Sequence, residues 1–109
     1  MLEEIRQVRV GPHDVRVYWV DEPPTEEHRA EYDPMTLDIQ VLTRGRPLTA
    51  LAEDLVHELL HALVDNSGGD LVAHEKGEDL EERAVELLAP RLLALLRDNP
   101  SLIAELQTR

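Results

Sequence analysis

The 109-residue sequence predicts a single α+β domain, in which helices cover one face of a small antiparallel sheet of about three strands. Two observations carry this prediction. Apolar and polar residues alternate with a period of two in the first forty residues, whereas apolar residues after position 48 recur with helical spacing. The length suits one hydrophobic core, so residues 1–109 are expected to form one domain.

Three segments before residue 42 are predicted to be strands because apolar side chains alternate along them. The first contains Val8 and Val10, and the second contains Val15, Val17 and Trp19. Gly11-Pro12-His13-Asp14 lies between them and is typical of a hairpin turn. The clearest alternation comes third, with one face formed by Met35, Leu37, Ile39 and Val41. The acidic segment 21–29 before it is predicted to be an exposed loop.

Helices are predicted for the rest of the chain. The first runs from about Leu48 to Asp65 and has a broad apolar stripe formed by Leu48, Leu51, Leu55, Leu59, Ala62 and Leu63. Asn66-Ser67-Gly68-Gly69 ends this helix. A second helix is expected from Asp79 toward Asp98, kinked or split by Pro90. Asn99 and Pro100 have the residue types of an N-cap and a first helical position, so a short last helix follows them.

The composition excludes several functions. A formal net charge of −12 disfavours direct binding to nucleic acid and to anionic membrane surfaces. The absence of cysteine excludes thiolate metal sites and fits a reducing compartment. No apolar secretory segment follows Met1, and no apolar stretch is long enough to cross a membrane, so a cytoplasmic location is expected. Nothing in the sequence indicates an oligomeric state.

The first predicted helix contains the string His57-Glu58-Leu59-Leu60-His61. Histidines four residues apart lie one above the other on a helix, so His57 and His61 can bind the same metal ion. Glu58 lies next to the first histidine and can act as a general base on a water molecule, which is the zincin arrangement. The alternative is a pair of solvent-facing histidines that bind no metal.

A third ligand is expected from the second helix. A histidine six residues beyond His61 would indicate a metzincin, but Ser67 occupies that position. The second helix offers carboxylates instead, at Glu78, Glu81, Glu82 and Glu86. We favour Glu82 as the ligand, with Glu86 one turn later orienting a histidine.

Several alternatives remain open for this ligand. Glu82 has the spacing of a capping box with Asp79, so it could simply terminate the helix. Glu78 could pair with Glu82 as ligand and orienting group, and His74 could bind the metal or donate to a developing oxyanion. Asp54 and Asp65 share the histidine side of their helix and are expected to be solvated, although one could support an imidazole. No role is assigned to His13 or His28.

The motif and the segment Glu82-Arg83-Ala84-Val85-Glu86-Leu87-Leu88-Ala89 together resemble gluzincin-type metallopeptidases. Small bacteriophage-encoded and ImmA/IrrE-like proteins share this order of a short strand region, an HExxH helix and a Glu-bearing helix. The short length is similar to that of the minigluzincins. The resemblance extends from about Met35 to Asp98.

The resemblance implies a zincin-like fold with zinc on His57, His61 and Glu82, Glu58 activating a water molecule, and Glu86 as the orienting carboxylate. Many relatives carry Asp or Asn where this chain has Glu86. Larger gluzincins use a further Tyr or His to stabilise the tetrahedral intermediate, and the candidates here are Tyr32 and His74.

The expected function is zinc-dependent hydrolysis of peptide bonds, with an extended peptide or protein segment paired to the strand near Met35 to Val41. A ligand set of two histidines and a glutamate suits zinc and also accommodates manganese, iron or cobalt. One alternative is a regulatory or interaction module that binds metal without turnover, with the helix from Ser101 to Leu106 lying over the cleft. Another is a structural domain without metal.

Overall fold

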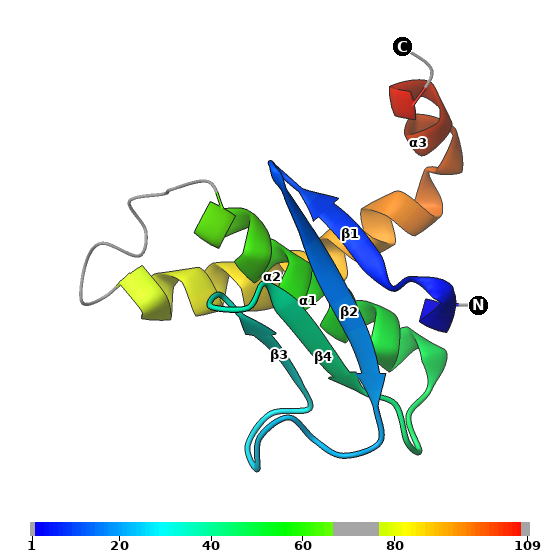
Figure 1. Cartoon of the computed structure of the whole chain (residues 1–109). Coiled ribbons are helices and arrows are strands. Elements are labelled where there is room, and N and C mark those ends of the chain that lie inside the picture. Colours follow the sequence, from blue (N-terminus) through cyan, green and yellow to red (C-terminus); the bar gives the residue numbers. More distant parts are fainter. Residues whose placement is uncertain (1, 67–76, 108–109) are drawn as a thin grey trace.

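The computed structural model describes residues 2–66 and 77–107, without the side chains of residues 77–79. Figure 1 shows an α+β fold with a sheet on one side and α1 and α2 on the other. A short 3₁₀ helix, η1, spans Leu2–Glu4 and precedes the sheet. The four strands are β1 (Gln7–Val10), β2 (His13–Val20), β3 (Ala30–Asp33) and β4 (Asp38–Leu42). The three α-helices are α1 (Leu48–Asn66), α2 (Gly77–Asp98) and α3 (Pro100–Gln107).

The sheet is mixed, so the prediction of an antiparallel sheet with about three strands is wrong in two respects. The strand order is β1-β2-β4-β3, and β4 runs parallel to β2, with Val17 opposite Ile39. The segment after β2 crosses to the far edge and forms β3, which had not been predicted. The chain then turns back, and β4 enters between β3 and β2. The short β3 escaped detection because only Ala30 and Tyr32 of its four residues face the core.

The predicted third strand is shorter than expected. Residues Asp33 to Leu37 form a tight turn in which the Leu37 amide donates to the Asp33 carbonyl over 2.8 Å. Leu37 adopts a left-handed backbone with φ of 60°, and Met35 is 89% exposed, so neither extends the face of Ile39 and Val41. Ile39 and Val41 are fully buried, as predicted.

The core lies between the sheet and α1. Its buried members from the strands and α1 are Val10, Val15, Val17, Ile39, Val41, Leu51, Leu55 and Ala62. The predicted helix agrees with α1 to within one residue at its C-terminal end. Its stripe is narrower than expected, because Leu48 and Leu63 are about half exposed. The core is aliphatic, with Trp19 and Tyr32 packing at its margin.

Helix α2 packs against α1 and buries Val85 and Ala89. It begins at Gly77, two residues before the predicted start, and continues through Pro90, so the expected split is absent. Helix α3 begins at Pro100, as predicted, and the Asn99 carbonyl accepts from the Leu102 amide over 3.0 Å. The side-chain amide of Asn99 donates to the Leu95 carbonyl of α2 over 2.9 Å. Helix α3 points away from the sheet in Figure 1. Among the described residues, no helix is both long enough and apolar enough to cross a lipid bilayer.

A comparison of the buried Ile39 with the exposed Met35 provides a test of this fold. Ile39→Ala should lower the free energy of unfolding by about 2–5 kcal/mol, because it leaves a cavity in the centre of the sheet. Met35→Ala should change it by less than about 0.5 kcal/mol, because the side chain is already in water. Urea unfolding of both variants checks the prediction. Equal losses would mean that Met35 shares the buried face.

Candidate metal centre

The two histidines of α1 meet a glutamate from α2. His57 Nε2 lies 3.0 Å from Glu82 Oε1, and His61 Nε2 lies 2.8 Å from Glu82 Oε2. The two imidazole rings lie one helical turn apart, with centroids 5.1 Å apart and planes tilted by 58°. Their separation follows from the four-residue spacing, and the approach of Glu82 follows from the packing of α2 on α1. The structure therefore brings together the three residues that the sequence singled out as ligands.

The donor set fits a small divalent cation. One ligand atom from each of His57, His61 and Glu82 can be chosen so that all three lie within 4.8 Å of one another. Two ligands at about 2.1 Å from a tetrahedral ion are themselves about 3.4 Å apart, so only small side-chain adjustments separate this arrangement from coordination. Two imidazoles and one carboxylate are the protein ligands of many catalytic zinc sites.

A second carboxylate, from Glu81, contacts the other nitrogen of His61. Glu81 Oε2 lies 2.5 Å from His61 Nδ1, and the Glu81 side chain is only 14% exposed. An ionised carboxylate can only accept a hydrogen bond, so this contact favours a proton on Nδ1, and the contact of Nε2 with Glu82 requires a proton or a cation between them. Such a contact fixes the tautomer and the ring orientation of a ligating histidine.

The prediction that Glu86 orients a histidine is therefore wrong, since Glu81 occupies that position. The reason is the helical phase of α2. Glu81 lies one turn before the buried Val85, on the same face of α2. Glu86 directly follows Val85, so it lies about 100° from Val85 around the helix axis, and it is exposed. The capping-box alternative is also wrong, because α2 begins at Gly77, which places Asp79 inside the helix.

Glu58 is the one buried charged residue of the described part of the chain. Its Oε1 accepts a hydrogen bond from the backbone amide of Tyr32 over 2.8 Å, while Oε2 lies 3.9 Å from His57 Nε2. Burial raises the pKa of the Glu58 carboxyl, an effect that the nearby histidines and the Tyr32 amide partly offset. The sequence indicated Glu58 but not its strand partner, since a backbone amide leaves no trace in residue identity.

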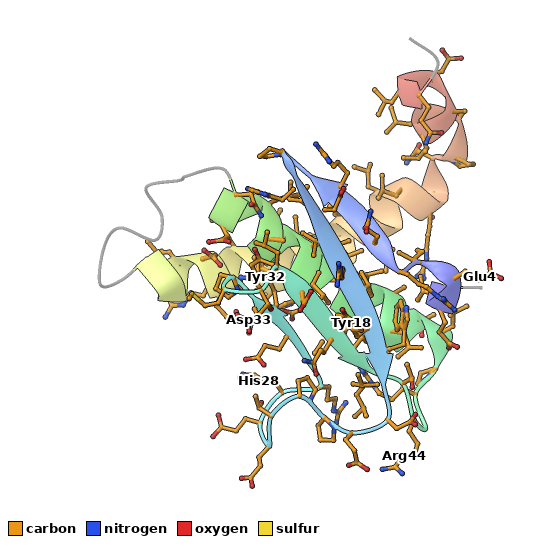
Figure 2. All side chains as sticks on the ribbon, in the orientation of Figure 1. Glu4, Tyr18, His28, Tyr32, Asp33 and Arg44 are labelled. Carbon is orange, nitrogen blue, oxygen red and sulfur yellow. The ribbon has the colours of Figure 1, made fainter. Side chains whose placement is uncertain are left out.

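Tyr32, labelled in Figure 2, belongs to β3, and its side chain contacts Asp65 near the end of α1. Its hydroxyl donates to Asp65 Oδ2 over 2.7 Å, and the side-chain amide of Asn66 donates to the hydroxyl oxygen of Tyr32 over 3.5 Å. Burial and the bond to Asp65 raise the pKa of Tyr32 to about 12. Asp65 therefore binds a phenol rather than an imidazole. Asp54 forms an ion pair with Arg46 instead, and neither aspartate supports a histidine in this structure.

These groups surround a cavity of about 360 Å³ between β3, α1 and the start of α2. It is lined by His28, Ala30, Glu31, Tyr32, Pro34, His57, Glu58, His61, Asp65, Glu81 and Glu82. A second cavity, of about 290 Å³, is also lined by His28, Ala30, His57 and Glu58 and extends toward Asp54. His28 thus borders the site, although no role was assigned to it from the sequence. No residue of α3 lines either cavity, contrary to the expectation that the last helix covers the cleft.

The edge of the sheet beside the cavity is formed by β3 and not by β4. A peptide cannot pair with β4, because β2 and β3 flank it on both sides, so the strand expected to bind substrate was wrongly chosen. The free edge beside the cavity belongs to β3. His74 and the side chain of Glu78, the alternative ligands, lie outside the described residues.

Comparisons with known protein families, with curated proteins and with solved structures found no match to this chain.

The Tyr32–Asp65 contact predicts a pH dependence of stability. Because the pKa of Tyr32 rises from 10.0 in the unfolded chain to about 12 in the folded one, the folded state retains a proton that the unfolded state has lost. Stability should therefore fall as the pH rises from about 10 to about 12. Urea unfolding across this range should show a shallower fall for Tyr32→Phe than for Tyr18→Phe, which removes a hydroxyl from the exposed face. An equal fall in the free energy of unfolding in the two variants would rule out the contact between Tyr32 and Asp65.

Proposed function

We propose that this protein is a zinc-dependent metallopeptidase of the gluzincin type, with His57, His61 and Glu82 as metal ligands and Glu58 as the general base. The observation that carries the proposal is the convergence of the three ligand side chains beside a buried Glu58 within one cavity. The resemblance of the HExxH string and the Glu-bearing helix to small phage-encoded and ImmA/IrrE-like peptidases supports the same assignment.

When bound to these ligands, zinc supplies Lewis acidity that polarises a carbonyl group and makes a water molecule more acidic. The chain's own contribution begins at Glu58. Its Oε2 is the carboxylate oxygen nearer to the His57 ligand atom, so it is placed to accept the proton of the attacking water. The same proton then passes to the leaving amine as the C–N bond breaks, which yields a carboxylate and an amine. The raised pKa of Glu58 suits this exchange.

The substrate would be an extended peptide or an unfolded protein segment. Strand β3 is the free edge that borders the cavity, and an extended chain can pair with such an edge through its backbone. In an antiparallel pair, alternate residues direct their backbone groups away from the partner strand. On β3 these residues are Ala30 and Tyr32, and the Tyr32 amide is already bound to Glu58. The Ala30 backbone is therefore the group best placed to align a peptide.

A metal-binding regulatory module without turnover is the second candidate. One specific observation favours it. The hydroxyl of Tyr32, which could otherwise stabilise an oxyanion, donates its hydrogen bond to Asp65. A chain with this site could bind zinc, and could bind an extended segment on β3, without hydrolysing it.

Three glutamates on α2 allow a matched test of metal binding. Glu82→Gln should cause the largest loss of zinc affinity, because it replaces a ligand. Glu81→Gln should weaken affinity by about 10-fold to 100-fold, because it removes the charge that orients His61. Glu86→Gln removes the same charge from an exposed position and should leave affinity unchanged. Titration of the metal-free chain with zinc against a competing chelator measures all three. A similar loss in the three variants would indicate a general charge effect.

Hydrolysis tests the role of Glu58. The zinc-loaded chain should cleave an unfolded protein, and Glu58→Ala should reduce kcat by at least about 100-fold because the proton acceptor is gone. Zinc affinity should change far less than kcat, because Glu58 is not among the three ligands. Mass spectrometry of the products checks cleavage. Equal turnover by the two proteins would exclude Glu58 as the base, and zinc binding without turnover in either would support the regulatory module.

A further inference from the structure

Tyr32 links the edge strand β3 to helix α1, which carries the HExxH string, through two hydrogen bonds. Its backbone amide donates to Glu58 Oε1 over 2.8 Å, and its hydroxyl donates to Asp65 Oδ2 over 2.7 Å. Both acceptors belong to α1 and are seven residues apart, which is two helical turns. The two contacts of Tyr32 therefore lie at Glu58, within the motif, and at Asp65, one turn beyond its end, and both acceptors line the cavity.

The amide is available to Glu58 because of the register of β3. The carbonyl of Arg29 accepts from the Leu42 amide, and the carbonyl of Asp33 accepts from the Leu37 amide. The odd-numbered residues of this segment therefore direct their backbone groups toward β4 and the turn before it. Alternate residues of an antiparallel strand point the other way, so the Tyr32 amide faces the free edge of the sheet. A donor at this edge would otherwise be solvated, and here it meets a buried carboxylate instead.

The hydrogen bond determines which oxygen of Glu58 faces the ligands. With Oε1 bound to Tyr32, the second oxygen is directed toward His57, 3.9 Å from its Nε2. Rotation of the carboxylate would break a charge-assisted hydrogen bond in a buried setting, which is costly. The hydroxyl contact with Asp65 is a second link between the same residue of β3 and α1, two turns from the first.

We propose that Tyr32 is a positioning residue for the general base: its edge-strand amide holds Glu58, and the bond from its hydroxyl to Asp65 keeps that amide in place. This inference rests on the proposed function for its catalytic consequence, but the contact itself can be tested without turnover. Asp65 is then part of the same device, in a position where the sequence suggested only a solvated carboxylate.

The chain contains two tyrosines, so labelling with ¹⁵N-tyrosine gives two backbone amide signals, from Tyr18 and Tyr32. Tyr18→Phe assigns them by removing one. Tyr18 lies on the exposed face of β2, as Figure 2 shows, and its signal is the internal control.

The experiment uses the full chain with one equivalent of zinc. The variants are Glu58→Ala, which removes the acceptor of the amide, Asp65→Ala, which removes the acceptor of the hydroxyl, and Asp65→Asn, which removes charge but keeps an acceptor oxygen.

The Tyr32 amide proton should move upfield in Glu58→Ala, because a proton bound to a carboxylate is deshielded. It should move in the same direction, by less, in Asp65→Ala, and return toward its original position in Asp65→Asn, while the Tyr18 signal stays fixed. In hydrolysis assays, Asp65→Ala should lower kcat by about 10-fold to 100-fold with KM and zinc affinity unchanged, because a displaced base affects only the chemical step. Asp65→Asn should restore most of the rate.

An unchanged Tyr32 signal in Glu58→Ala would overturn the proposal, since the contact would then be absent. A signal that responds to Glu58→Ala but not to Asp65→Ala would overturn the part assigned to the hydroxyl. Equal losses of rate in Asp65→Ala and Asp65→Asn would also contradict it, because charge rather than position would then be responsible. If the wild-type chain hydrolyses nothing, the proposed function fails, and the two signals alone decide whether Tyr32 holds Glu58.

Discussion

The structure depends on α1 serving two packing partners at once. One side of this helix carries Leu51, Leu55 and Ala62 into the core beneath the sheet. An adjoining side carries His57 and His61 toward α2, where Glu81 and Glu82 meet them. Because a helix is rigid over these two turns, burial of the apolar side fixes the direction of the imidazoles. The core and the candidate metal centre are therefore parts of the same helix packing.

The electrostatics of the cluster suit a cation. Glu58, Glu81 and Glu82 gather around two imidazoles in a chain that carries a net charge of −12. Carboxylates can face both nitrogens of His61 only if protons or a metal ion lie between them. Proton and metal thus compete for the same positions, as they do at metal sites in general. The acidity of the whole chain favours the entry of a divalent cation.

The sequence predicted the helices well and the sheet poorly. The apolar stripe of α1 spans several turns, so local periodicity identified the helix, and the HExxH string was recognised within it from its residue types and spacing. Strand β3 contains only four residues, which is too few for a clear alternating pattern. Strand β4 pairs in parallel with β2, which lies about twenty residues earlier in the chain, so no local pattern could define the register of β4 on β2. The same limit affected the orienting carboxylate. Glu86 and Glu81 differ in helical phase relative to α1, and that phase is set by the packing of α2, which buries Val85 and Ala89.

By itself, the sequence determined the pair His57 and His61, the adjacent Glu58 as a candidate base, and a set of carboxylates from which Glu82 was favoured, because helical spacing and side-chain chemistry are local properties. Only the tertiary structure decided that Glu82 reaches both imidazoles, that Glu81 supports His61, and that Tyr32 meets Glu58 and Asp65. These contacts join residues twenty or more positions apart, so they depend on the packing of α2 and β3 against α1.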